Sequence, residues 1–220
     1  MGRAGQGESR ILGLATAVVQ CALAFTGTSN MPAKNTADRF GGVAQLLHWL
    51  IAGLILLQWI MIEWAEEAEH ARKTDPAAAL EQLAWMTRHK SVGMTILMLA
   101  IVRLVWRRMS PPPAWPPAMP AWQVLAARAV HYAFYALLFL LPLSGWLMSS
   151  SANRPVSWFG LFTWPDLVAP DKALHHQLED VHEILFNVVA GLALVHVVAA
   201  LKHQFVDKDR LLGRMLPWGG

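Results

Sequence analysis

Apolar residues are gathered into four long runs, which polar segments separate. The runs cover roughly residues 43–63, 88–108, 126–148 and 181–204, and residues 64–87 between the first two are expected to form a polar loop. Each is about 20 residues or longer, which is the length an α-helix needs to cross a hydrocarbon layer about 30 Å thick. The pattern therefore predicts an all-α fold, namely a transmembrane four-helix bundle.

Composition supports a membrane protein and excludes several other classes. Hydrophobic residues make up 55% of the chain and charged residues 15%, against about a quarter charged in a soluble domain. Eleven tryptophans against two tyrosines suggest anchoring at membrane interfaces. The net charge is +3, but the basic residues lie between apolar runs, which argues against nucleic acid as a partner. The single cysteine, Cys21, excludes an intramolecular disulfide and a CxxC motif.

Charges in the connecting segments predict the orientation of the bundle. Ten Lys/Arg and three Asp/Glu lie in three segments: the segment from Met31, the proline-rich connector near 110–122, and the C-terminal tail. This count includes Arg103 and Arg128, which lie on the predicted helices on either side of the connector. The other two loops, with the helix ends beside them, hold six Lys/Arg and eleven Asp/Glu. By the positive-inside rule, both termini are cytoplasmic and both acidic loops lie outside.

The first 38 residues do not fit this orientation and are treated as an N-terminal extension, followed by a domain over 39–217. An apolar run after Arg3 and Arg10 resembles a signal peptide or a short extra helix. Either of these would reverse the predicted orientation. We therefore favour Met31 as the true start, with the preceding residues a mis-assigned extension.

Four histidines fall into two levels once the orientation is set. His48 and His196 lie near the inner ends of the first and fourth runs, while His89 and His182 lie at the outer ends of the second and fourth. His196 follows His182 by fourteen residues, so both lie within roughly 40° on one helix face, about 21 Å apart. Two imidazoles on different helices at one level are how a bundle holds a haem b iron. The pattern predicts two haem b groups, stacked across the membrane.

Arg103 adds an independent signal. It follows His89 by fourteen residues, which repeats the offset from His182 to His196. It therefore lies on the same face of its helix as His89, at the depth of the inner haem. A haem propionate is a suitable partner for a buried arginine. The alternative is an arginine that extends to the headgroups, as Arg107 and Arg108 do.

The remaining histidines have weaker interpretations. His131 is interpreted as a packing residue, with contact to a quinone or a propionate as the alternative. His203 continues the face of His182 and His196 but lies near the headgroups, where it would be interfacial or contact a propionate. Three histidines of the outer loops are interpreted as solvated, with a divalent ion as the alternative: His70, His175 and His176. No Gly-rich phosphate loop or nucleophile elbow occurs.

Several motifs together resemble the bacterial cytochrome b561 family. They are RFGGVAQLLHW, HKSVG, RLVWR, LPLSGW and the run VHEILFNVVAGLALVHVVAALKH with its basic tail, and they extend over roughly residues 39–217. The resemblance implies a multi-pass protein of the bacterial inner membrane with two b haems that exchanges electrons with the quinone pool. It places the iron ligands on His48, His89, His182 and His196. Gln204 follows His203, where relatives often have a second histidine.

We therefore expect a membrane cytochrome that transfers electrons between quinone and a partner at the outer face. It is an electron carrier or a quinone-dependent oxidoreductase. Superoxide:quinone oxidoreductase activity is one form of the latter, although the acidic outer loops would repel superoxide. A haem-carrying membrane anchor subunit of a periplasmic oxidoreductase is an alternative, and a haem-free transporter with proton-relay histidines is another. The assembly is left open, with a homodimer as one option.

Overall fold

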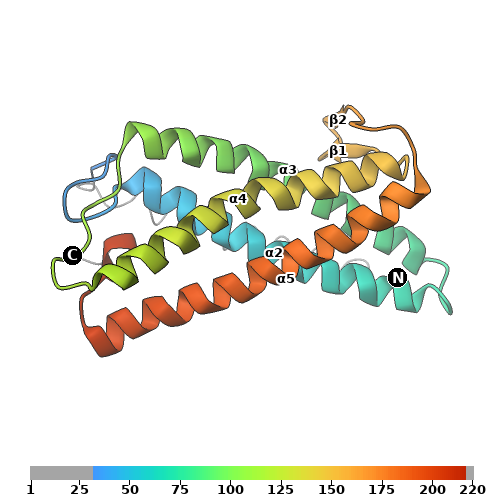
Figure 1. Ribbon diagram of the computed structural model, residues 1–220. Helices are drawn as coiled ribbons and strands as arrows, with labels where there is room; N and C mark the ends of the chain where they lie inside the picture. Colours follow the sequence, from blue (N-terminus) through green and yellow to red (C-terminus); the bar gives the residue numbers. More distant parts are fainter. Residues whose placement is uncertain (1–31, 217–220) are drawn as a thin grey trace.

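The computed structural model describes residues 32–216, and four long helices dominate this part of the chain (Figure 1). They are α2 (Gly42–Ala71), α3 (Ala78–Met109), α4 (Ala121–Ser151) and α5 (Lys172–Lys202). The predicted all-α four-helix bundle is confirmed. The predictions about the N-terminal extension, including a start at Met31, fall outside the described residues.

The helices pack as two antiparallel pairs, α2 with α3 and α4 with α5 (Figure 1). The main core lies between α2 and α3, and its buried residues are Ile51, Met61, Ala65, Trp85, Val92 and Ile96. Helix α5 buries only Val189 and exposes a face of branched apolar side chains that includes Ile184, Val188 and Leu194. Such a face suits contact with lipid.

All four helices extend beyond the predicted apolar runs, so the prediction of a polar loop over residues 64–87 is wrong. Helix α2 continues to Ala71 and α3 already begins at Ala78. The two extensions pack on each other, with the Trp64 and Trp85 rings 4.7 Å apart. Hydropathy marks the part of a helix that crosses lipid, whereas these Ala-, Glu- and Gln-rich segments are good helix formers that continue into water.

A two-stranded antiparallel sheet, which the sequence did not predict, lies between α4 and α5. Strand β1 (Val156–Trp158) pairs with β2 (Phe162–Trp164). The turn uses Gly160 at φ 75° and Phe159 at φ 49°, and left-handed backbone of this kind is typical of tight hairpins. The Ser91 hydroxyl accepts a hydrogen bond from the Phe159 backbone N–H, which ties the hairpin to α3.

Three helices are long and apolar enough to cross a membrane, namely α2, α4 and α5 with its C-terminal extension. Helix α3 is not among them, and it contains the charged residues Arg88, Lys90 and Arg103. It is also the helix with the most buried side chains in the described chain. The prediction that α3 also spans stays a prediction.

The two ends of the bundle differ in what covers them (Figure 1). The hairpin lies at one end, which we call the outer end after the predicted orientation. The segment before α2, the proline-rich connector and the C-terminal segment gather at the opposite end, the inner end. The C-terminal segment contains a π-helical turn (His203–Asp207) and a 3₁₀ turn (Leu212–Met215).

Candidate functional site

The four predicted ligand histidines meet in two pairs, as the depth argument predicts. At the inner level, the rings of His48 on α2 and His196 on α5 have centroids 6.3 Å apart and planes at 71°. At the outer level, the rings of His89 on α3 and His182 on α5 are 6.4 Å apart, with planes at 75°. Helix α5 therefore contributes one ring to each level.

The spacing within each pair fits a shared metal atom. A metal–imidazole bond of about 2.0 Å, plus about 1.1 Å from that nitrogen to the ring centre, gives about 6.2 Å between two rings on opposite sides of one metal. A direct hydrogen bond between two imidazoles does not account for the pairs, since neither pair has one in the described structure. Nδ1 of His89 is buried and has no hydrogen-bond partner among the described residues. The donor set and its spacing therefore fit bis-histidine ligation.

Around the outer pair, α4 supplies the nearest polar group. The Ser144 hydroxyl oxygen lies 2.9 Å from Nδ1 of His182, and Ser144 is buried. On the other side, the Gln58 side-chain amide donates to the His89 backbone carbonyl at 3.1 Å. Ser144 is part of the LPLSGW motif, but the sequence alone does not indicate a role for this serine.

Around the inner pair, Arg103 lies where its helical phase predicts. Its Nη2 is 3.4 Å from Nδ1 of His48, and its Nη1 is buried without a hydrogen-bond partner in the described part of the chain. The guanidinium carbons of Arg103 and Arg107 lie 6.0 Å and 5.4 Å from the centre of the Tyr135 ring. A partly buried cation with an unused donor beside the histidine pair fits an anionic group such as a propionate. That pairing stays a prediction.

His131 belongs to the inner level, which sequence reasoning missed. Its ring centroid is 5.9 Å from that of His196, and it stacks on Trp115 of the proline-rich connector with an interplanar angle of 16°. The sequence analysis interprets His131 as a packing residue, with contact to a quinone or a propionate as the alternative. Its depth, near the inner end of α4, was the available signal.

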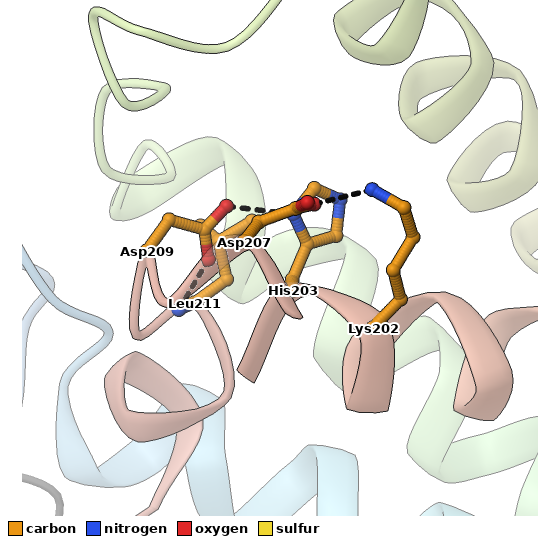
Figure 2. Close-up of polar contacts among 5 residues, drawn as sticks. All are labelled: Lys202, His203, Asp207, Asp209 and Leu211. Atoms are coloured by element: carbon orange, nitrogen blue, oxygen red, sulfur yellow. Dashed lines mark hydrogen bonds and ion pairs between the residues drawn. The ribbon is translucent and has the colours of Figure 1, made fainter. Parts of the chain in front are cut away.

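His203 is held in a polar cluster of its own at the end of α5 (Figure 2). Its Nδ1 lies 2.6 Å from Asp209 Oδ2 and 3.1 Å from Asp207 Oδ2. Three potential metal ligands lie within 4.8 Å of one another here, but Lys202 pairs with Asp207, and Asp209 Oδ1 accepts from the Leu211 backbone N–H. Because both carboxylates already have partners within the chain, we interpret the cluster as structural.

The three histidines predicted in the outer loops lie on helices instead. His70 is in the last turn of α2, and His175 and His176 are in the first turns of α5. The α5 N-terminus is capped by Asp171, whose side chain accepts from two backbone N–H groups, as N-cap aspartates do. His175 contacts the Met148 carbonyl at 3.1 Å, and His176 faces Glu179.

The C-terminal segment connects α5 to the start of α2 beside His48. The Trp49 indole N–H donates to the Met215 carbonyl at 2.8 Å. The Gln45 side chain is fully buried, and its amide donates to the carbonyls of Phe40 and Arg214. These bonds hold together the two helices that carry the inner pair.

Replacing Trp49 with phenylalanine should therefore destabilise the inner end. The loss of one hydrogen bond with its carbonyl left unpaired predicts a decrease of about 1 kcal/mol in the free energy of unfolding. Thermal unfolding of the purified protein in detergent measures this. Trp59→Phe is the matched control, because Trp59 is on the same helix and donates only to Glu63 at an exposed site. Equal effects of the two changes would contradict the prediction.

Comparison with known proteins agrees with this architecture. A family model described as prokaryotic cytochrome b561 matches residues 39–218. Cytochrome b561 homolog 2 of Escherichia coli is 34% identical over 190 residues, which are 84% of this chain and 95% of that protein. Cytochrome b562 of Cereibacter sphaeroides is 33% identical over 172 residues, or 77% and 90% of the two chains. A probable superoxide oxidase of Yersinia pestis is 31% identical over 174 residues, or 78% and 92%.

These similarities cover most of each protein and extend over all four helices and both histidine levels. The membrane location that this family implies agrees with the three helices that are long and apolar enough to cross a membrane. The chain belongs to the prokaryotic cytochrome b561 family and is a bacterial membrane protein with a haem b electron-transfer role.

Proposed function

We propose that the chain binds two haem b groups and passes electrons between the quinone pool and a partner at the outer end. His48 and His196 are the ligands of the inner haem, and His89 and His182 are those of the outer haem. The observation that carries this proposal is the pair of ring separations, 6.3 Å and 6.4 Å, at two levels that share α5.

When bound, haem b supplies a carrier that accepts and releases one electron at a time. The residues of the chain bind and position this group and exclude water from it. The histidines bind as neutral imidazoles from three different helices, which fixes the position of each group between the two helix pairs. The apolar faces of the helices exclude water, and Arg103 pairs with a propionate of the inner haem. Two haems held at opposite ends of one bundle make an electron path across the hydrocarbon layer.

The orientation is part of the same proposal. The chain lies in the inner membrane with four spans, α3 included, and both termini in the cytoplasm. The charge distribution supports this, because the basic connector and tail lie at the inner end and the acidic helix ends at the hairpin end. The charges of α3 are tolerated because this helix is shielded by its neighbours.

Superoxide is a second candidate for the outer electron donor. The observation that favours it is the Yersinia pestis relative, which is described as a probable superoxide oxidase. Two superoxide ions would each lose one electron to give two O₂, and one quinone with two protons would become one quinol. The excess of acidic over basic residues at the outer end opposes rapid approach of an anion.

Quinol should reduce the haems of the purified protein. In liposomes that contain the protein with its hairpin end outward, an anaerobic quinol is expected to produce a reduced b-type absorption band. A membrane-impermeant oxidant added outside should then remove the band. Dithionite reduction sets the full amplitude. A protein that dithionite reduces but quinol does not would contradict the quinone assignment.

A further inference from the structure

We propose that Ser144 and Gly145 of α4 form a seat for the ring of His182, which fixes its tautomer and its position and tunes the outer haem. This inference rests on the proposed role of His182 as a ligand. The two residues are adjacent on α4, and both lie against the same imidazole. We call this pair the His182 seat.

The tautomer of His182 follows from counting hydrogens at Ser144. The Ser144 oxygen lies 2.8 Å from the Leu141 carbonyl oxygen and 2.9 Å from Nδ1 of His182. A carbonyl only accepts and a hydroxyl has one hydrogen, so Ser144 donates to Leu141. Its oxygen then accepts from the N–H at Nδ1. A neutral imidazole has one N–H, and the lone pair that can bind iron is therefore at Nε2.

Gly145 sets how closely the ring approaches α4. A Cβ at this position would lie 3.0 Å from Cε1 of His182 and 3.4 Å from Nδ1. The ring thus rests on the helix backbone itself, and an added methyl group would push it away. The backbone at Gly145 and the Ser144 hydroxyl therefore hold the His182 ring in one position.

The inner pair has the opposite kind of neighbour. Nδ1 of His48 lies 3.4 Å from Nη2 of Arg103. A guanidinium can only donate, so it cannot accept the N–H that His48 would carry at Nδ1 as a ligand through Nε2. The outer pair has a buried hydrogen-bond acceptor, whereas the inner pair has a cation. An acceptor on the far N–H makes an imidazole a stronger electron donor to its metal, which favours the oxidised metal. The seat should therefore hold the outer haem at a more negative potential than it would have without the hydroxyl.

The test is a redox titration of the haem-loaded full-length protein, followed by absorption and by low-spin EPR. The outer haem is identified as the component that His182→Ala removes. In Ser144→Ala, the midpoint of the outer haem should move to a more positive potential and its EPR signal should change. The inner haem should keep both its potential and its signal. Ser144→Thr, which retains a hydroxyl, should restore the outer haem toward the wild-type values.

Ser151→Ala is the matched control. Ser151 is equally buried on the same helix and donates to a carbonyl three residues back, that of Met148, as Ser144 does to Leu141. It has no hydrogen bond to a histidine in the described structure, so its removal should leave both haems unchanged. Gly145→Ala should lower the occupancy of the outer haem while the inner haem, still bound, reports an intact fold.

The possible failures are distinguishable. If both haems are present and Ser144→Ala shifts neither, or shifts both equally, the seat is wrong while the proposed function stands. An outer haem that responds to Ser151→Ala as strongly as to Ser144→Ala also overturns the seat. If the wild-type protein has no second haem signal that His182→Ala removes, the ligand assignment itself fails, and the seat fails with it.

Discussion

Replacing His182 with alanine is expected to remove the outer haem and leave the inner one, and His196→Ala is expected to do the reverse. In each variant, the affected haem would lose one of the two histidines proposed to hold it, while the other pair keeps both of its rings. Electron transfer from quinol to an outer acceptor should fall to background in both variants, because each has lost one half of the path. Reduced-minus-oxidised spectra and EPR of the purified variants measure the loss.

His176→Ala is the control for this pair. His176 is on α5 as well, but it is exposed and faces only Glu179, so both haems should remain. The partners give a second check, because His89→Ala should reproduce the spectrum of His182→Ala, and His48→Ala that of His196→Ala. Loss of both haems from each variant, with the helical fold intact, would contradict two independent levels.

Replacing Arg103 with glutamine is expected to act in opposite directions on the haem-free and haem-loaded proteins. Without haem, Arg103 is a partly buried cation with an unused donor, so its removal should leave the stability unchanged or raise it. With haem, the lost ion pair should weaken retention of the inner haem by about 10- to 100-fold, the range typical of outer-shell partners. Transfer of haem to an excess of a haem-free acceptor protein measures retention, and thermal unfolding measures stability.

Arg108→Gln separates this effect from a general loss of positive charge. Arg108 is exposed near the end of the same helix, so the same change there should leave haem retention unaltered. If Arg103→Gln and Arg108→Gln behave alike, the interpretation of Arg103 as an arginine that extends to the headgroups is the better one.

The pairing of histidines could be predicted from sequence because it depends on two regular quantities. Helical phase places His182 and His196 on one face of α5, and charge asymmetry assigns each histidine an end. Together these bring His48 toward His196 and His89 toward His182, which the structure confirms as neighbours. The same phase argument placed Arg103 beside the inner pair.

Other features depend on contacts between distant segments, for which periodicity holds no signal. The Ser144 contact with His182 joins α4 to α5, and the Trp115 stack on His131 brings a proline-rich connector onto α4. The hairpin is too short for an alternating pattern to be recognised. The helix extensions were missed for another reason, since their polar composition masks their helical propensity.

The most direct test of the central claim is the ratio of haem b to protein in the purified chain, measured by haem extraction against quantitative amino-acid analysis. If each histidine pair binds one haem iron, as we propose, the ratio should be about two for the wild type and about one for His182→Ala and His196→Ala. A wild-type ratio of one under conditions of haem excess, or a ratio of two retained in either variant, would contradict the two-level account.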